Sequence, residues 1–502
     1  MMIRKIILIT VFNWALLLNA QNTFVATLSM GGDDTNAGTL ISPFATVNQA
    51  LSVMSAGDTC FIREGHYSEE VMIDGKNNIV VMPYMNEWVV FDGTEPIQSN
   101  WTIHSGNIYK TVLSKHIWQL FVDQQEMVMA RWPNGNFSDK SIYNWNSWAT
   151  GIVDSANGFP NGSYNGFELV DSTKKDLGAT GLNLTGAIGI MNVGSFKTFN
   201  RKITSHNVQD NFFSYNTIPN NTYRDKHHHF FVEGKLELLD QPNEWFYDTT
   251  SKTLYLYPDN GQNPNGRNIA GKVQDYAITI TNSTDVLIKN IYFFATTFFA
   301  KSSDNLLIEG CHFSFPNCSK RMLREFEVAP NVSSLGQSGS ANEVHNSVVR
   351  KCLFEYTDGE ALRVYGDSNV IENCYMQYID YSVSELPFLM VGVYFSGDAN
   401  KFLHNTVHDA AASAFLAPGT TPEFAFNDVW STGALQSDGS VYQGTSATVQ
   451  NSHIHHNYIH DTPKYALRFD APGGDPGQAG QYGNMHHNIA VRTNGIMVKG
   501  NH

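Results

Sequence analysis

Two aspartates near the end of the chain lie in short apolar runs that follow one another. Asp438 opens the run DGSVYQG, and Asp470 closes the run YALRFD, two residues after Arg468. Two carboxyl groups can hydrolyse a glycosidic bond, because one protonates the leaving oxygen while the other attacks the sugar or activates water. An arginine beside such a carboxylate keeps it ionised or binds substrate. We therefore predict Asp438 and Asp470 as a catalytic pair; a turn aspartate and a surface ion pair are the structural alternatives.

These runs belong to a series of strand-like segments in the second half of the chain, most of which end at an asparagine. The asparagines are Asn290, Asn373, Asn405, Asn427, Asn457 and Asn488, and Gly310 and Lys351 fit the same frame. Repeats of about 20–30 residues indicate a solenoid, since each unit is too short to bury its own apolar face. Alternating Val, Ile, Phe and Tyr indicate strands. We therefore predict an all-β fold, a right-handed parallel β-helix with long parallel sheets.

The asparagine position suits the bend between two sheets, because asparagine tolerates left-handed backbone and its amide can bond its equivalent one turn away. In this frame the following residue points inward. The predicted interior column is Ile291, Cys311, Cys352, Cys374, Thr406, Asp428, Tyr458 and Ile489. The three consecutive cysteines would stack as small apolar side chains. A disulfide between Cys352 and Cys374 is the alternative in an oxidising compartment.

Five residues on or beside these strands are predicted to contact substrate: Arg363, Arg468, His408, Glu360 and Tyr442. Glu360 lies in the column of Asp438 but three turns earlier, about 14 Å away, which suits a further subsite rather than a direct pair. His408 and Asp409 recur in register as His460 and Asp461. A structural turn is therefore the alternative role of His408.

The chain divides into four segments. Residues 1–20 have a basic start, an apolar centre and small residues before Ala20, which predicts a secretory signal peptide, with a membrane anchor as the alternative. Residues 21–103 predict a cap, including a short helix from Phe44 to Met54, and the first turns of the solenoid. Residues 104–275 lack the asparagine period and predict an inserted antiparallel β module, and residues 276–502 carry the main turns. The chain stops within a turn, so we expect the C-terminus to be incomplete or covered by another chain.

The composition limits the partners of the protein. The net charge is −15 with 16% charged residues, and without a basic run we expect no nucleic acid. No segment after the signal peptide is long and apolar enough to cross a bilayer. We therefore expect a secreted monomer, extracellular or periplasmic, whose partner is a polysaccharide. The sequence has no C-x-x-C or EF-hand pattern, so we expect no required cofactor, while structural calcium remains open.

Several phrases of the chain resemble a known family. The N-terminal phrases FVATLSMGGDDTNAGT and AGDTCFIREGHY are similar to the entry segments of secreted polysaccharide-degrading β-helix enzymes. The module phrases FVDQQEMVMARWPN and EGKLELLDQPNEWFYD resemble glycoside hydrolase family 141 and related fucan-degrading enzymes. The resemblance implies a glycoside hydrolase that acts on a fucose-containing or sulfated marine polymer. It also implies that Asp438 is catalytic, because the matching family segment carries a catalytic carboxylate. We expect endo action, because a solenoid offers a long open groove.

Two other functions remain open. The segment GEALRVYGDSNVIENC, with Arg363, resembles the arginine turn of polysaccharide lyase family 6. That family needs a lysine base one turn earlier, and no lysine here matches because residues 315–345 interrupt the preceding turn. A non-catalytic carbohydrate-binding or adhesin β-helix would equally produce the repeats, but it would tolerate the loss of both Asp438 and Asp470.

Overall fold

The computed structural model describes residues 21–499 except 99, 154–166, 170–176, 193–195, 210–212, 217–228, 383–384, 386–389, 437, 446–449 and 472–480. The predicted signal peptide lies outside the described residues. Among the helices that are described, none is long and apolar enough to span a membrane.

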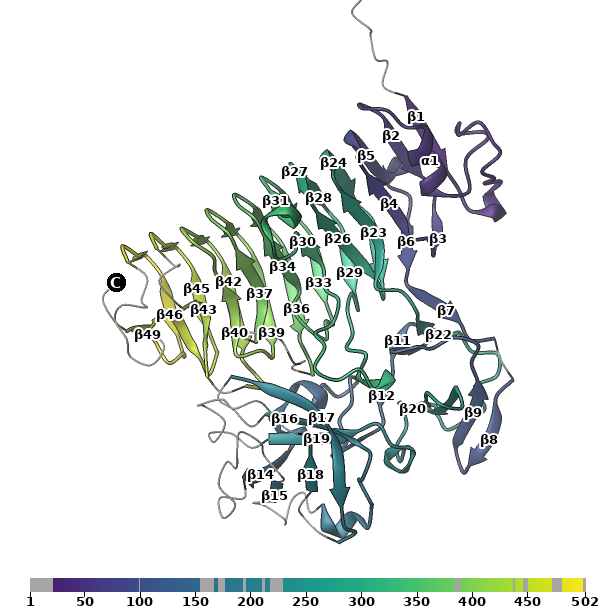
Figure 1. The fold of residues 1–502 in the computed structure, drawn as a ribbon, viewed down its shortest axis with the longest axis vertical. Coiled ribbons are helices and arrows are strands. Elements are labelled where there is room, and N and C mark those ends of the chain that lie inside the picture. Colours follow the sequence, from purple (N-terminus) through teal and green to yellow (C-terminus); the bar gives the residue numbers. More distant parts are fainter. Residues whose placement is uncertain are drawn as a thin grey trace, which may run out of the picture.

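Most strands form three long parallel sheets that run along a coil, and each turn gives one strand to sheet 1, then sheet 2, then sheet 3 (Figure 1). Sheet 1 contains β1 (Asn22–Val25), β2 (Thr59–Ile62), β5 (Asn77–Pro83), β24 (Thr284–Lys289), β28 (Leu307–Glu309), β32 (Val348–Arg350), β35 (Val370–Glu372), β38 (Lys401–Leu403), β41 (Glu423–Ala425), β44 (His453–His455) and β47 (Asn484–His486), with β27 (Ser303–Asp304) and β31 (Val344–His345) beside them.

Sheet 2 contains β3 (Gly65–Tyr67), β6 (Val89–Asp92), β25 (Tyr292–Phe294), β29 (His312–Ser314), β33 (Leu353–Glu355), β36 (Tyr375–Ile379), β39 (Thr406–Ala410), β42 (Asp428–Thr432), β45 (Tyr458–His460) and β48 (Ile489–Val491). Sheet 3 contains β4 (Val71–Asp74), β23 (Tyr276–Thr281), β26 (Thr297–Lys301), β30 (Ser334–Leu335), β34 (Leu362–Tyr365), β37 (Val391–Ser396), β40 (Ala414–Ala417), β43 (Ser440–Thr445), β46 (Tyr465–Asp470) and β49 (Ile496–Val498). The predicted parallel β-helix is therefore confirmed.

The core of the coil follows from strand alternation, which turns every second side chain inward. In sheet 2 the rings of Phe91, Phe293, Phe313 and Phe354 stack on successive turns, with centroids 5.8, 4.7 and 4.7 Å apart. All four rings are fully buried, and each contributes on the order of 2–3 kcal/mol to stability. The repeated apolar positions of the sequence thus form continuous columns through the coil.

The asparagine ladder exists, but the predicted register is wrong by one residue in the later turns. Asn373 has a left-handed backbone with φ 51°, and in the next turn His404, with φ 56°, occupies this position. Asn405 instead continues the inward column of Cys374, whose backbone N donates to Asn405 Oδ1 over 2.9 Å. The left-handed position accepts histidine as well as asparagine. Aligning the turns by their asparagines therefore gave the wrong register.

The inward asparagines form a ladder made of the buried Asn405, Asn427 and Asn457 and the half-buried Asn488. The backbone N of Asn405 donates to Asn427 Oδ1 over 2.9 Å, and Asn427 Nδ2 donates to Phe402 O over 3.0 Å and to Asn457 Oδ1 over 2.9 Å. Each amide therefore satisfies backbone groups at the bend where the strand pairing is interrupted. Buried backbone groups without such partners would cost free energy.

The cysteine column is confirmed as a stack of buried thiols. Cys311, Cys352 and Cys374 are each no more than 2% exposed, and all five cysteines are free. The alternative disulfide between Cys352 and Cys374 does not form. Burial raises the pKa of the Cys352 thiol well above its ordinary value, so it stays protonated.

The N-terminal end of the coil carries the helix α1 (Val47–Val53), which the sequence predicted over a slightly longer range. The side chain of Thr46 caps it by accepting a hydrogen bond from Gln49 N over 3.1 Å. Val47, Ala50 and Leu51 are buried, and the helix contacts β1, β2 and β4. It therefore covers the first turns of the coil.

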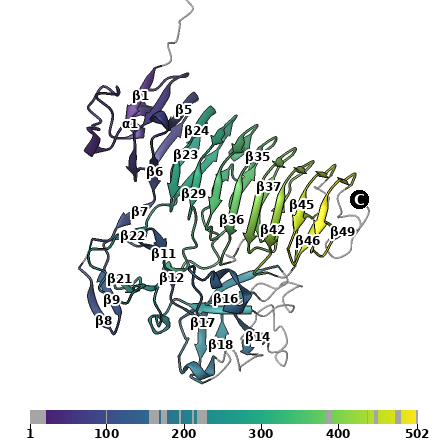
Figure 2. The same cartoon turned by 180° about the vertical axis from the view of Figure 1, so that it is seen from behind.

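The inserted module contains three further sheets and docks beside the coil (Figure 2). Its strands are β7 (Thr94–Pro96), β8 (Thr102–Ser105), β9 (Ile108–Val112), β10 (Leu120–Val122), β11 (Gln125–Glu126), β12 (Val128–Met129), β13 (Arg131–Trp132), β14 (Ala149–Val153), β15 (Phe167–Leu169), β16 (Ile188–Asn192), β17 (Thr198–His206), β18 (Phe213–Tyr215), β19 (His229–Glu233), β20 (Glu244–Asp248), β21 (Thr253–Tyr257) and β22 (Ile269–Lys272). Because β7 pairs with β22, the module begins at Thr94 rather than at residue 104. Trp148 and Trp245 are buried in it and cannot stack on a sugar from solution.

We expect Asn427→Ala to lower the free energy of unfolding by about 2–4 kcal/mol, because it leaves several buried backbone and amide groups without partners. Urea unfolding followed by circular dichroism measures the change. Asn107→Ala, at an exposed position in the module, is the matched control and should change stability by less than about 0.5 kcal/mol. Equal effects of the two substitutions would contradict a structural role of the ladder.

Candidate active site

The two predicted catalytic aspartates lie at opposite ends of two neighbouring strands of sheet 3, and one arginine contacts both of them. Asp438 precedes β43, and Asp470 ends the adjacent parallel strand β46. Leu467 and Phe469 belong to the core, so Arg468 and Asp470 face outward by strand alternation. Arg468 Nη1 lies 2.7 Å from Asp438 Oδ1, and Arg468 Nη2 lies 2.8 Å from Asp470 Oδ2. One guanidinium group therefore bridges both carboxylates.

Further polar groups hold the two carboxylates. Asp470 Oδ1 lies 3.0 Å from Lys499 Nζ, and Gln443 Nε2 donates to Asp470 Oδ2 over 3.2 Å. Asp438 Oδ1 also accepts from Gly439 N over 2.7 Å. The side chain of Asp438 is 33% exposed and that of Asp470 is 13% exposed. Asp438 is therefore the more open of the two groups, and Asp470 is the more firmly held.

The shared guanidinium limits the separation of the carboxylates. Because both touch terminal nitrogens of one planar group, their nearest oxygens lie within about 8 Å of each other, a range that includes retaining and inverting hydrolases. The pair is thus close enough to act on one glycosidic bond.

A buried lysine lies next to this pair. Lys464 is 3% exposed, and its Nζ donates to Gln436 O. Burial lowers the pKa of Lys464 to about 7, against the opposing charge of Asp438. A substantial fraction of this amine is therefore neutral near pH 7, which is unusual for lysine.

The inserted module contacts the turn that precedes β43. Gln436 Nε2 donates to Thr198 Oγ1 of β17 over 2.9 Å, and Gln436 Oε1 accepts from Ser413 N over 2.7 Å. Gln436 lies two residues before Asp438. The turn that carries Asp438 is therefore attached both to the coil and to the module.

Two of the predicted substrate contacts lie elsewhere on sheet 3. Arg363 Nη2 donates to both carboxylate oxygens of Glu360, each over 2.8 Å. Strands β37, β40 and β43 separate β34 from β46, so Arg363 is about 19 Å from Arg468 along the sheet. This pair can serve only a distant subsite.

His408 lies on the adjoining face, in sheet 2. Its Nε2 is 2.7 Å from Tyr375 Oη, its Nδ1 is 2.8 Å from Asp409 Oδ2, and its ring stacks on Trp430 at 4.6 Å. These contacts fill both ring nitrogens and one ring face. The structural alternative therefore describes His408 better than a direct contact beside Asp438.

The prediction that Tyr442 contacts substrate is wrong. Tyr442 is 0% exposed and packs inside the coil, where its hydroxyl donates to Ser452 Oγ over 3.1 Å. Its neighbour Gln443 faces outward, next to Asp470. Alternation along β43 therefore turns Tyr442 inward.

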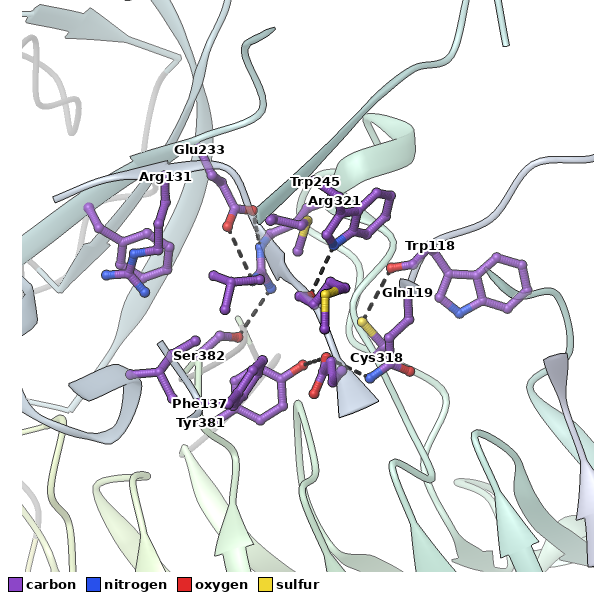
Figure 3. A pocket seen from close by; sticks show the side chains of 16 residues that line it. Trp118, Gln119, Arg131, Phe137, Glu233, Trp245, Cys318, Arg321, Tyr381 and Ser382 are labelled. Atoms are coloured by element: carbon purple, nitrogen blue, oxygen red, sulfur yellow. Dashed lines mark hydrogen bonds and ion pairs between the residues drawn. The ribbon is translucent and has the colours of Figure 1, made fainter. Parts of the chain in front are cut away.

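Sequence reasoning missed a cluster of charged side chains between the module and the coil (Figure 3). Arg321, from η8 (Arg321–Leu323) in the 315–345 excursion, pairs with Glu233 of the module. Its Nη1 also lies 3.2 Å from Asp358 Oδ2 and donates to Ser382 Oγ over 3.1 Å. The enclosed space is only about 20 Å³, too small for a sugar. This cluster therefore joins the two parts of the chain and does not bind substrate.

Glu126 lies at the same junction. Its Oε1 accepts from Gln119 Nε2 over 2.7 Å and from Tyr381 Oη over 2.8 Å. Burial raises the pKa of Glu126 to about 8, despite these hydrogen bonds. The group is therefore protonated near neutral pH. Its place in the fold was not predictable, because Tyr381 lies far along the chain from it.

A larger cavity, of about 430 Å³, opens beside Glu126 and is lined by module residues and by aromatic side chains of sheet 2. It also contains Glu355. Burial alone would raise the pKa of Glu355, but hydrogen bonds from His312, Ser314 and Gln377 have the larger effect and lower the pKa. The cavity thus holds one protonated and one ionised carboxyl group, an arrangement that suits acid and base roles. The existing partners of Glu355 occupy both of its oxygens.

We expect Arg321→Met to lower the free energy of unfolding by about 3–5 kcal/mol, because it leaves two buried carboxylates without their cation. Urea unfolding measures the loss. Arg492→Met removes a comparable pair with Asp461 at a 65% exposed side chain and should cost less than about 1 kcal/mol. Equal costs would show that the junction contributes no more than a surface pair.

We expect Glu126→Gln to change how stability depends on pH. The folded protein keeps a proton on Glu126 up to about pH 8, whereas an unfolded glutamate loses it near pH 4.3, so the contribution of this group to stability falls as pH rises through this interval. Glutamine preserves the shape and does not titrate. As the pH rises from 4.5 to 8, the free energy of unfolding of the variant should increase by about 1–4 kcal/mol relative to that of the unsubstituted protein.

Urea unfolding at pH 4.5, 6 and 8 tests this. Glu237→Gln, whose side chain is 59% exposed, is the control. Parallel pH profiles for the unsubstituted protein and Glu126→Gln would contradict a protonated, buried Glu126.

Comparison with known proteins supports the fold. A family model described as the right-handed beta helix region matches residues 255–429, and one described as a protein of unknown function (DUF1565) matches residues 30–77. No curated protein matches the chain. Together with the three parallel sheets, the first match establishes a right-handed parallel β-helix.

Solved structures share this architecture at low sequence identity. A chain described as a glycoside hydrolase is similar over 95% of this chain and 96% of its own, with a TM-score of 0.65 and 14% identity. The complex of XylC with xylose has a TM-score of 0.46 at 12% identity, covering 94% of this chain and 66% of its own. The lacto-N-biosidase of family GH136 from Eubacterium ramulus has a TM-score of 0.33 at 9% identity, covering 95% and 68%. At such identities the likeness to the first chain shows the fold alone, a right-handed parallel β-helix.

Proposed function

We propose that the protein is a carbohydrate-acting enzyme, a secreted glycoside hydrolase whose active site contains Asp438, Arg468 and Asp470. The observation that carries the proposal is the guanidinium of Arg468, which holds two outward carboxylates from consecutive turns together. The similar chain described as a glycoside hydrolase supports this class of reaction. Two carboxyl groups within reach of one bond are the minimum that such hydrolysis needs.

The two aspartates have different roles. Asp470 is sheltered and contacts both Arg468 and Lys499, so it is held in place to act as nucleophile or as base for water. Asp438 is more exposed, and it contacts Arg468. Asp438 is therefore the proton donor to the leaving oxygen.

The substrate class follows from the resemblance to fucan-degrading enzymes and from the charges near the pair. Arg468 and Lys499 provide cationic groups beside the carboxylates, and such groups suit sulfate substituents. The outward face of sheet 3 continues for several turns to Arg363. We propose endo cleavage of a fucose-containing or sulfated polysaccharide along this face.

One observation favours a second function, β-elimination of a uronate polymer by a lyase. Such a reaction needs a base and a group that neutralises the carboxylate of the substrate. Lys464, with a pKa lowered to about 7, could serve as the base beside Arg468. Lys464 is only 3% exposed, so it could reach substrate only after displacement, and the hydrolase remains the better proposal.

A panel of fucoidans, xylans, alginate, pectins and carrageenans tests the function. New reducing ends without absorbance near 235 nm would support hydrolysis. Absorbance near 235 nm would reveal an unsaturated product and replace the hydrolase by the lyase. Binding of a polymer without any cleavage would leave a carbohydrate-binding protein.

Substitutions test the roles on a cleaved polymer. Asp470→Asn should lower kcat by at least about 10³-fold on every substrate, because it removes the nucleophile or base. Asp438→Asn should lower it by about 10²–10⁴-fold on the polymer but far less on an aryl glycoside whose leaving group needs no proton. Circular dichroism confirms that each variant is folded.

Two further variants locate the reaction. Asp461→Asn, at a surface carboxylate of sheet 2 with a 42% exposed side chain, is the control and should keep full activity. If Glu355→Gln abolishes cleavage while both aspartate variants remain active, the catalytic pair lies in the module cavity and not at Arg468.

A further inference from the structure

A second group of chemically reactive side chains lies on the outward face of sheet 1, away from the aspartate pair. It consists of Glu423 on β41, His453 and His455 on β44, and His486 on β47. The strand register pairs Glu423 with His453 and His455 with His486. Since alternate residues share a face and adjacent strands are about 4.8 Å apart, Glu423, His453 and His455 converge, and His486 lies beside His453. Strands β45 and β46, next in the chain after β44, mark this part of the coil in Figure 1.

The distances fit a metal site. Ligand atoms of Glu423, His453 and His455 all lie within 4.8 Å of one another. Glu423 Oε1 is 3.3 Å from His455 Nε2, and His453 Nε2 is 3.0 Å from His486 Nε2. Ligands around a tetrahedral zinc ion are about 3.3 Å apart, because each bond is about 2.0–2.1 Å long. Both contacts therefore already approach the spacing that one ion would impose.

Neighbouring histidines orient these rings. His455 Nδ1 lies 2.9 Å from His456 Nδ1, and His486 Nδ1 lies 2.8 Å from His487 Nδ1. A contact between two ring nitrogens at this distance requires one to donate and the other to accept. If Nδ1 of His455 and of His486 donates, both Nε2 lone pairs face the cluster. Metal-binding histidines are commonly held by a hydrogen bond at the other ring nitrogen.

A lysine orients the carboxylate of this group. Lys401 Nζ lies 2.8 Å from Glu423 Oε2 and holds that oxygen, which leaves Oε1 directed at the histidines.

We propose that Glu423, His453 and His455, with His486 as the fourth ligand, bind one divalent transition-metal ion of the zinc class. The ligands would be three imidazole nitrogens and one carboxylate oxygen. This set suits zinc better than calcium, because calcium binds six to eight oxygen ligands. The ligands come from three consecutive turns of sheet 1. The ion therefore fastens β41, β44 and β47 to one another and stabilises this part of the coil.

The test uses the full-length protein without a histidine tag, stripped with EDTA and dialysed. Isothermal titration with Zn²⁺ should show one tight site per chain, and Ca²⁺ should show none. Zinc should also raise Tm in a concentration-dependent way, because the ion binds the folded state. His453→Ala and His486→Ala, both at partly exposed positions, should each weaken zinc binding by at least about 10-fold and reduce the rise in Tm.

His104→Ala, at an exposed module position, is the matched control and should bind zinc like the unsubstituted protein. Circular dichroism of the stripped variants establishes that they are folded before titration. Binding at less than one equivalent, binding unchanged in both cluster variants, or equal loss in His104→Ala would overturn the proposal. The outcome is independent of polysaccharide cleavage, since it is read from binding and from Tm.

Discussion

The whole molecule depends on the parallel stacking of one turn on the next, which requires every bend to satisfy its buried backbone groups. Strand pairing does this along the sheets but stops where the chain turns a corner. At one corner the buried ladder that includes Asn405 and Asn427 continues the hydrogen bonding from turn to turn. Because each amide bonds both a neighbouring amide and a carbonyl, the ladder holds the turns at the spacing of the strands. Outward side chains on successive turns are therefore separated by the same distance.

The same spacing explains why two separate clusters of polar and charged side chains occur on the outside of the coil. Residues two apart on one strand share a face, and the next turn adds another pair one strand spacing away. On sheet 3 this geometry places Arg468 and Asp470 beside Gln443, and the Arg468 side chain also reaches Asp438, which precedes the strand. On sheet 1 it joins His453 and His455 to their neighbours above and below. In such a coil, short sequence patterns that recur on successive turns bring polar side chains together in compact clusters.

This regularity also separates what could be predicted from what could not. Repeats and alternation in the sequence predicted the β-helix, and they predicted that Asp438 and Asp470 lie on neighbouring turns. The wrong prediction for Tyr442 could have been avoided, because neighbouring residues of a strand face opposite sides and Gln443 faces outward. The sequence did not show which turns have an asparagine at the left-handed position, because His404 adopts the same left-handed backbone as Asn373.

Contacts between the module and the coil follow no period. Arg321 and Glu233 come from an excursion and from the module, and nothing local in either segment shows that they meet. The same holds for Glu126 and Tyr381. Such contacts are decided by tertiary packing, and the sequence of either segment contains only a charged or polar residue that could equally have faced solvent.

The docking of the module matters for function because the outward faces of a β-helix are otherwise shallow. The buried charge cluster around Arg321 fixes the module against the coil, and Gln436 then links β17 of the module to the turn before Asp438. A catalytic aspartate on a surface turn would sample many orientations, whereas a turn hydrogen-bonded on both sides is held for reaction. Weakening the junction at Arg321 should therefore affect the aspartate pair as well as stability, although none of the junction residues lies in that pair.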